Sequence, residues 1–282
     1  MKIIRGKRAG FCMGVGLALK KLDETILKYP LQKIYTWGPI IHNPQVVEKY
    51  AKKGVIPIHD ISVISPHDVV VIRAHGVPKE LYQEIEKKGG IIIDATCPKV
   101  KKAQRLIDKE SSAKILLLFG EKDHPEVRGL LSHARNNGIV FSSIEELKKI
   151  LLDPTKSYFL ASQTTQERYE FMQIVKLLRD KLGKDFPVLD TICDATRLRQ
   201  QEAIEIAKKS DMVIVIGGYN SGNTRRLAQV VRATGTECYH FETPEEISPD
   251  LIKGKKTIGI TAGASTPEFI IDQLEKYIRD LQ

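Results

Sequence analysis

Short apolar runs alternate with longer amphipathic segments along most of the chain. Runs such as 69–72 (VVVI), 115–119 (ILLLF) and 212–216 (MVIVI) are wholly hydrophobic and lead into polar loops. Segments between such runs, for example 195–204 and 267–281, carry apolar residues at helical spacing. Uninterrupted apolar strands separated by helices are typical of parallel sheets built from βαβ units, so the pattern predicts an α/β fold.

The same order of elements occurs three times. A strand-like run leads into Cys12, Cys97 or Cys193, and a helical pattern follows each cysteine. A strand with a polar loop comes next, then a second strand with its loop and an amphipathic helix. Because the cysteines are spaced at nearly equal intervals, we predict three similar α/β units. Their bounds are 13–97, 98–193 and 194–282, and the N-terminal strand within 1–12 completes the third.

Parallel sheets bind ligands beyond the carboxyl ends of their strands, where the polar loops of all three repeats would lie. If the units pack around a pseudo-threefold axis with these edges inward, Cys12, Cys97 and Cys193 meet at the centre. A fourth cysteine, Cys238, shares no sequence context with them and is interpreted as a small packed side chain. The expected architecture is therefore a trefoil of three parallel-sheet units around a central site.

Composition narrows the class of protein. The chain has 282 residues, 42% of them hydrophobic and 28% charged, which is ordinary for a globular protein. No apolar stretch is long enough to cross a bilayer, and the N-terminus lacks a secretion signal, so we expect a cytoplasmic location. The net charge of +9 comes from lysines spread along helical segments, without a basic run beside aromatics. This favours a solvated surface or anionic partners, namely a phosphorylated substrate or an acidic electron-donor protein, over nucleic acid.

Three equivalent cysteines favour a metal site, although any one alone would be ordinary packing. Thiolates prefer zinc or iron–sulfur clusters. Structural zinc requires four ligands, generally in closely spaced pairs, and the three cysteines meet neither condition. A 4Fe-4S cluster held by three cysteines would keep one iron open to a substrate oxygen while the cluster supplies electrons.

The remaining strand-end loops carry groups that suit an anion and an acid. Several run into predicted helix starts, where backbone N–H groups favour phosphate. For Ser265 and Asn43 the alternative role is helix capping. Glu126 either stabilises a helix dipole or donates a proton to a leaving hydroxyl. The candidate anion ligands are His42, His75, His124, Thr164, Thr165, Ser221, Asn223 and Ser265.

Nine motifs in this order resemble the LytB-type 4-hydroxy-3-methylbut-2-enyl diphosphate reductase family. They are GFCMGV (10–15), IHN (41–43), AHGV (74–77), DATCP (94–98), HPEV (124–127), QTT (163–165), IC (192–193), NSGN (220–223) and TAGAS (261–265). The resemblance implies a trefoil around a 4Fe-4S cluster. It also implies reductive removal of an allylic hydroxyl to give isopentenyl and dimethylallyl diphosphate and water, the last step of the non-mevalonate isoprenoid pathway.

The resemblance also implies roles for individual residues. Glu126 would be the proton source, with Thr164 and His124 beside it. Some family members have a second serine where this chain has Gly222, whose N–H at a helix start can still face a phosphate. The implied cluster ligands are Cys12, Cys97 and Cys193, and the implied diphosphate contacts are His42, His75, His124, Thr164, Ser221, Gly222, Asn223 and Ser265.

Three other functions remain open at this point. An enzyme of the same architecture could dehydrate a hydroxylated substrate without consuming electrons. A redox or iron sensor would bind a cluster without turnover, but it would have no need of the anion ligands or of Glu126. A nucleic-acid binder is disfavoured because no dense basic run lies beside aromatic residues. For the reductase, a low-potential cluster suits a ferredoxin or flavodoxin as the electron donor.

Overall fold

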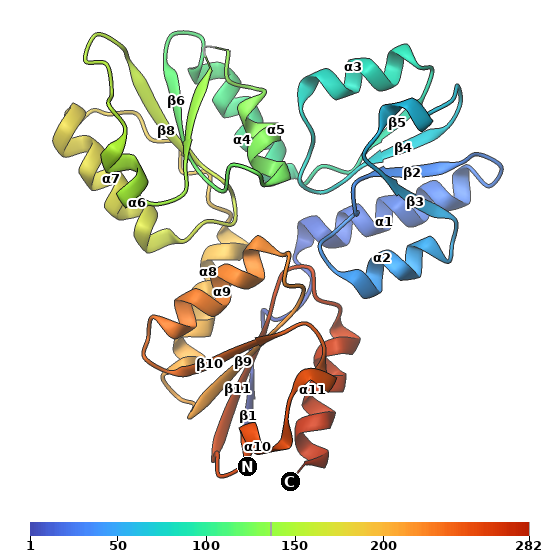
Figure 1. Cartoon of the computed structure of the whole chain (residues 1–282), viewed down its shortest axis with the longest axis vertical. Coiled ribbons are helices and arrows are strands. Elements are labelled where there is room, and N and C mark those ends of the chain that lie inside the picture. Colours follow the sequence, from blue (N-terminus) through green and yellow to red (C-terminus); the bar gives the residue numbers. More distant parts are fainter. Residues whose placement is uncertain (136, 282) are drawn as a thin grey trace. The chain divides into compact units, whose positions relative to one another are not determined.

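The computed structural model describes residues 1–135 and 137–281, so Gln282, the last residue of the predicted third unit, lies outside them. Within this part of the chain the strands form three sheets (Figure 1), and every strand pair is parallel. This confirms the predicted α/β class. In spatial order the sheets are β3 (Val55–Ile58), β2 (Ile34–Trp37), β4 (Val69–Ile72), β5 (Ile91–Asp94); then β7 (Gly138–Phe141), β6 (Ile115–Phe119), β8 (Tyr158–Ser162); then β10 (Glu237–Phe241), β9 (Met212–Ile216), β11 (Thr257–Ala262), β1 (Lys2–Arg5).

The three sheets share one topology. In each, the first strand after a cysteine lies in the middle, with the next strand on one side and the one after it on the other. A fourth strand position lies beyond the third strand. It is occupied by β5 in the sheet of β2, by a single parallel bridge between Leu160 and Val188 in the sheet of β6, and by the N-terminal β1 in the sheet of β9. The connecting helices are α1 (Met13–Lys28), α2 (Pro44–Ala51), α3 (Lys79–Lys87), α4 (Pro98–Glu110), α5 (Pro125–Leu131), α6 (Ile144–Lys149), α7 (Arg168–Leu182), α8 (Asp194–Ala207), α9 (Gly222–Arg232), α10 (Pro249–Ile252) and α11 (Glu268–Asp280).

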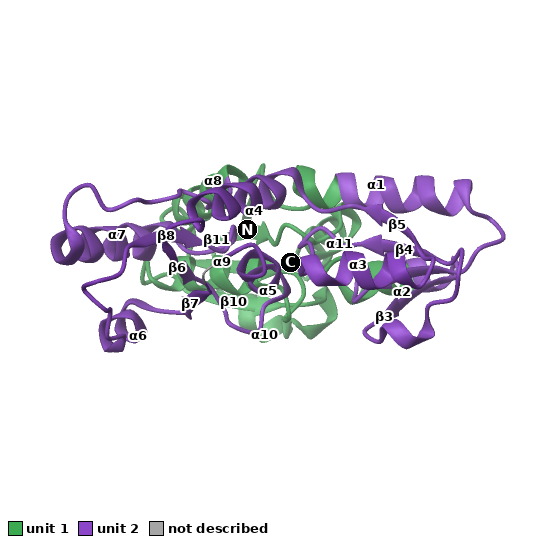
Figure 2. Ribbon diagram, turned by 90° about the horizontal axis from the view of Figure 1, so that it is seen from above, with its two compact units in different colours: residues 1–16, 41–49, 194–282 green, residues 17–40, 50–193 purple. Residues whose placement is uncertain are grey.

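The chain also divides into two compact units (Figure 2). Unit 1 comprises Met1–Gly16, Ile41–Lys49 and Asp194–Gln282 and contains the sheet of β9. Unit 2 comprises Leu17–Ile40 and Tyr50–Cys193 and contains the sheets of β2 and β6.

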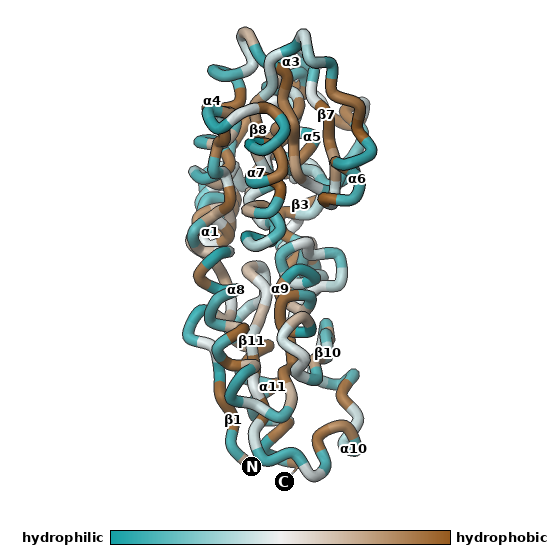
Figure 3. Tube along the Cα trace, turned by 90° about the vertical axis from the view of Figure 1, so that its left-hand side faces the viewer, coloured by the Kyte–Doolittle hydropathy of each residue, from teal (hydrophilic) through white to brown (hydrophobic). Residues whose placement is uncertain are grey.

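Both faces of the sheets are buried, which explains the uninterrupted apolar runs. In β6, Leu117 and Phe119 pack against α7, whereas Leu116 and Leu118 pack against α4 and α5. All four side chains are fully buried. Complete burial of such a side chain stabilises the fold by about 1.5–3 kcal/mol. Hydrophobic stretches accordingly alternate with hydrophilic ones along the trace (Figure 3), and a parallel strand covered on both faces needs no polar alternation.

A glycine directly follows the middle strand of each of the three sheets. Gly38, Gly120 and Gly217 each donate a backbone hydrogen bond, of 2.7–2.9 Å, to the last residue of the neighbouring strand. Gly217 has φ +142°, and a Cβ there would lie 2.4 Å from the Thr266 hydroxyl oxygen, so this turn requires glycine. The loops that follow these glycines begin at equivalent places, at the carboxyl ends of the strands.

No helix in the described ranges is both long enough and apolar enough to cross a membrane.

Candidate active site and cluster ligands

The three repeated cysteines have equivalent backbone environments. Each lies immediately before a helix, namely α1, α4 or α8. The backbone N–H of each donates to a carbonyl two residues beyond the end of a strand, namely β11, β4 or β8. The pairs are Cys12 with Ala264 (3.1 Å), Cys97 with Ala74 (2.9 Å) and Cys193 with Thr164 (2.9 Å). The sheets therefore place each cysteine at the carboxyl end of a strand, as the repeat predicted.

Each of these thiols lies at the N-terminus of a helix. A helix N-terminus stabilises a thiolate through its partial positive charge, and thiolate is the form that binds metal. Cys97 is the N-cap of α4, with Pro98 as the first helical residue and no capping hydrogen bond from its side chain. The Cys12 sulfur accepts a hydrogen bond from the Val15 N–H at 3.4 Å. All three side chains are partly exposed.

Cys238 is also partly exposed, but its position in the fold is different. It lies within β10, not before a helix, and its thiol donates to the Ala228 carbonyl at 3.7 Å. Burial raises the pKa of Cys238 to about 11, a shift that nearby Arg232 only partly opposes. The structure thus agrees with its interpretation as a packed side chain.

Unit 2 places Glu126 in direct contact with Thr164. Glu126 is the second residue of α5, and only 2% of it is exposed. Its Oε1 accepts the Thr164 backbone N–H at 2.6 Å, and its Oε2 accepts the Thr164 hydroxyl at 3.0 Å. His124 caps the same helix, because its Nδ1 accepts the Glu126 N–H at 3.2 Å. Because Nδ1 accepts this hydrogen bond, a neutral His124 ring carries its proton on Nε2.

Burial changes the acidity of this carboxyl group. Loss of hydration raises the pKa of Glu126 to about 7, although both Thr164 hydrogen bonds act in the opposite direction because they stabilise the carboxylate. A carboxyl with this pKa is substantially protonated near neutral pH. Glu126 can therefore donate a proton, and Thr164 can stabilise the anion that remains.

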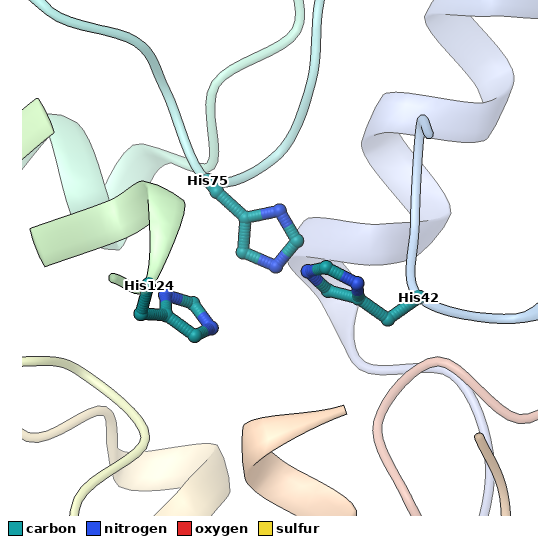
Figure 4. Close-up of side chains that lie close together, drawn as sticks. All are labelled: His42, His75 and His124. Atoms are coloured by element: carbon teal, nitrogen blue, oxygen red, sulfur yellow. The ribbon is translucent and has the colours of Figure 1, made fainter. Parts of the chain in front are cut away.

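His75 lies beside His124 in the same unit. Their ring centroids are 5.4 Å apart in an edge-on arrangement, shown in Figure 4. His75 follows β4, and the turn after it requires Gly76, which has φ +72° and has no room for a Cβ beside the Gln104 side chain. Figure 4 also draws His42, which belongs to unit 1 and is described with it.

Unit 1 gathers the loops with the other predicted anion ligands. The Ser265 hydroxyl donates to the His42 carbonyl at 3.3 Å. A Cβ at Gly218, in the loop before α9, would lie 2.6 Å from that same carbonyl oxygen. Ser221 caps α9, with its hydroxyl accepting the Thr224 N–H at 3.3 Å. Gly222 and the buried Asn223 are the first two residues of α9.

The alternative role of helix capping is confirmed for Asn43 but not for Ser265. The Asn43 side chain accepts the Val46 N–H at 2.9 Å, so Asn43 does cap α2. Ser265 does not cap α11, whose N-cap is Pro267, and its hydroxyl is used in the contact with His42. The capping hypothesis for Ser265 was therefore wrong.

The predicted residues are thus divided between the two units. Unit 2 contains Cys97, Cys193, His75, His124, Glu126 and Thr164, and unit 1 contains Cys12, His42, Ser221, Gly222, Asn223 and Ser265.

Comparison with known proteins identifies the family. Residues 3–279 match the family model described as LytB protein. The chain belongs to the LytB family. It is 53% identical to the 4-hydroxy-3-methylbut-2-enyl diphosphate reductase of Solidesulfovibrio magneticus over 99% of each chain.

Solved structures of LytB relatives have the same fold. The E-1-hydroxy-2-methyl-but-2-enyl-4-diphosphate reductase of Plasmodium falciparum aligns with a TM-score of 0.92 at 28% identity, covering 98% of this chain and 87% of that one. A second structure, of (E)-4-hydroxy-3-methyl-but-2-enyl diphosphate reductase, described as the terminal enzyme of the non-mevalonate pathway, aligns with a TM-score of 0.70 at 40% identity. That alignment covers 99% of this chain and 100% of the other.

Membership of the LytB family implies an iron–sulfur cluster, and the chemistry of the chain fits one. Cys12, Cys97 and Cys193 each precede a helix, whereas Cys238 lies within β10, where burial raises the pKa of its thiol. Thiolates at such positions are the ligands that iron–sulfur clusters use.

Two supporting carboxylates were not foreseen from the sequence. Asp94 accepts the Thr96 N–H at 2.9 Å and pairs with Lys101 at 2.5 Å, which shapes the turn before Cys97. An Asx turn is recognisable from an aspartate two residues before a threonine, so this signal was available. Glu202 accepts the N–H groups of Lys7 and Arg8 at 3.1 and 2.9 Å and shapes the loop that leads to Cys12. No local signal marks a contact between residues so far apart.

Proposed function

We propose that this chain reductively dehydroxylates 4-hydroxy-3-methylbut-2-enyl diphosphate to isopentenyl and dimethylallyl diphosphate, as the last step of the non-mevalonate isoprenoid pathway. The full-length similarity to reductases of that name supports the assignment. The observation that carries it is the buried, protonatable Glu126 bound to Thr164, because an allylic hydroxyl must be protonated before it leaves as water. In balance, the substrate R–OH, two electrons and two protons give R–H and water.

A 4Fe-4S cluster held by Cys12, Cys97 and Cys193 is part of this proposal. The equivalent position of the three thiols before helices, and the different environment of Cys238, support this ligand set. With three protein ligands, the bound cluster supplies electrons and one open iron that acts as a Lewis acid toward the hydroxyl oxygen.

Glu126 is proposed as the acid. Its pKa near 7 matches a proton donor at neutral pH. After donation, the Thr164 N–H and hydroxyl stabilise the carboxylate, and the N-terminus of α5 adds favourable charge. His124 contributes by accepting the Glu126 N–H, which holds the first turn of α5 in place.

The diphosphate is proposed to bind the imidazoles, the hydroxyls and the start of α9. The α9 N-terminus offers the Gly222 N–H and the Asn223 amide beside Ser221, and helix N-termini favour phosphate. The His42 and Ser265 loops adjoin each other in the same unit. The full set of proposed contacts is His42, His75, His124, Thr164, Ser221, Gly222, Asn223 and Ser265.

The first test is spectroscopic. The protein, purified without oxygen, is expected to contain about four irons with matching sulfide, and one Mössbauer iron signal should shift when the hydroxylated diphosphate is added. A chain that holds zinc, or no cluster after anaerobic reconstitution, would refute the proposal. Turnover with and without an electron donor separates the reductase from a dehydratase, because only the reductase consumes two electrons per product.

The electron donor is proposed to be an acidic carrier protein such as a ferredoxin or flavodoxin, and the basic net charge of +9 supports an anionic partner. The cytoplasmic location stays a prediction.

A further inference from the structure

Unit 2 contains a groove of about 930 Å³ beside the loop that carries Cys97. Thr96 and Pro98, the two neighbours of Cys97 in the chain, both line it. Its walls come from α1, α3 and α4. Five cationic side chains line the groove, namely Lys20, Lys21, Lys79, Lys101 and Arg105.

The charge of the groove is only partly compensated. Glu24 and Asp94 are the acidic residues that line it. Asp94 is engaged by Lys101 at 2.5 Å, and Glu24 lies 3.8 Å from Lys20 on an exposed helix turn, a contact too weak to neutralise either group. Lys79 pairs with Asp108 at 2.8 Å, whereas Arg105 makes no ion pair with any described residue. The groove therefore presents a positive surface to solvent.

None of the residues proposed to bind the diphosphate lines this groove. The groove is instead placed where a partner protein would come close to a cluster ligand, because its lining includes both residues that flank Cys97. Clustered lysines and arginines on long side chains attract an acidic partner and accelerate its association. The proposed reaction requires two electrons that the substrate does not supply.

We infer that this groove is the docking surface for an acidic one-electron carrier protein, which delivers electrons beside Cys97. The inference rests on the proposed function. Each docking event oxidises one reduced carrier and passes one electron to the enzyme. Two such events, with two protons, convert R–OH to R–H and water and release two oxidised carriers.

The test reverses charge at Lys20 and Arg105 together, because neither residue shapes the Cys97 turn. Lys101 is left intact because it pairs with Asp94, which holds that turn. The matched control reverses the same number of charges at Lys176, within α7, and Lys184, just beyond it, which are both exposed and do not line the groove. The probe is an acidic ferredoxin, compared with dithionite-reduced methyl viologen as a small reductant.

At low ionic strength the K20E/R105E enzyme is expected to bind oxidised ferredoxin about tenfold more weakly than wild type, and the difference should shrink as salt is added. The KM for reduced ferredoxin should rise by a similar factor. Iron content and turnover with methyl viologen should equal those of wild type, and the K176E/K184E control should bind ferredoxin normally.

Equal ferredoxin affinity in K20E/R105E and wild type would overturn the inference, as would equal weakening in the control. A changed KM for the diphosphate with methyl viologen would assign the groove to the substrate instead and would also overturn it. If the double variant does not fold, K20E alone, at an exposed position of α1, supplies the same binding comparison at about half the effect. Absence of turnover with methyl viologen in wild type would instead refute the proposed function.

Discussion

Replacement of Glu126 by glutamine tests the central feature of the site, because it should raise stability while it abolishes the proposed acid. Glutamine has the same shape as glutamate. Its side-chain carbonyl can accept the Thr164 N–H, and its amide can donate to the Thr164 hydroxyl, so both contacts of Glu126 can persist. The change therefore removes a buried ionisable group without creating a cavity.

The magnitude follows from the pKa of Glu126. Burial raises this pKa from 4.5 to about 7 in the folded protein, so the folded state binds the proton more tightly than the unfolded state does. Below pH 4.5 the group is protonated in both states and costs nothing. As the pH rises from 4.5 to 7, the carboxyl group ionises in the unfolded state before it ionises in the folded state, and this favours unfolding. At about 1.4 kcal/mol per pH unit, wild type loses about 3 kcal/mol of stability over this interval through Glu126 alone.

The E126Q variant has no ionisable group at this position, so it does not lose stability in this way. Its stability relative to wild type should therefore increase by about 3 kcal/mol between pH 4.5 and about pH 8. Equilibrium urea unfolding of both proteins at several pH values measures the difference, and all other titrating groups cancel in the comparison. A stability difference that does not change with pH would show that Glu126 titrates normally, and the argument for a buried acid would then be wrong.

Activity should change in the opposite direction. Loss of a general acid typically lowers turnover about 100- to 10,000-fold, and E126Q should do so with its iron content intact. Wild-type turnover should fall as the pH rises through about 7, where Glu126 loses its proton. In Thr164→Val the hydroxyl that stabilises the carboxylate is absent, so the pKa of Glu126 should rise and the fall in turnover should move to higher pH. Unchanged turnover in E126Q would remove Glu126 from the acid role.

Two further predictions concern other parts of the chain. Cys238→Ala should keep the iron content of wild type, whereas Cys97→Ser should lower it, as measured by iron and sulfide analysis; loss of iron in the Cys238 variant would contradict the ligand set. Gly263→Ala should lower the free energy of unfolding by about 1–3 kcal/mol, because the new Cβ would lie 1.9 Å from the buried Thr224 hydroxyl oxygen. Gly16→Ala, in a helix and with no atom within 4 Å of its Cβ, should instead raise it by about 0.5–1 kcal/mol, and similar effects of the two substitutions would refute the steric argument.

The fold class was predictable because its signal is local and repeated. Strands such as β6 and β9 are buried on both faces, so their sequences are continuously apolar and contrast with the amphipathic helices around them. The division into two compact units was not predicted. Ile41–Lys49 belongs with Asp194–Gln282 in unit 1 although the chain between them belongs to unit 2, and no pattern within nine residues indicates such a long-range association.

The site was predictable in its residue types but not in its energetics. Motif spacing placed Glu126 next to His124, and the structure shows how the two are joined through the Glu126 N–H. The raised pKa of Glu126 depends on burial, which arises from packing that a short motif does not encode. The Arg199 guanidinium, which donates to the Gly10 carbonyl at 2.9 Å, likewise has no signal near the Cys12 motif that it supports.

The three repeats share one backbone contact but differ in their side chains. Ala74, Thr164 and Ala264 each accept the N–H of a cysteine, because strand ends fix the position of their carbonyls. In two of these loops the next residue, His75 or Ser265, is a proposed anion contact. In the loop after β8, Thr164 itself binds Glu126 through its N–H and hydroxyl while its carbonyl accepts the Cys193 N–H. One residue thus positions the proposed acid and a proposed cluster ligand relative to the same strand.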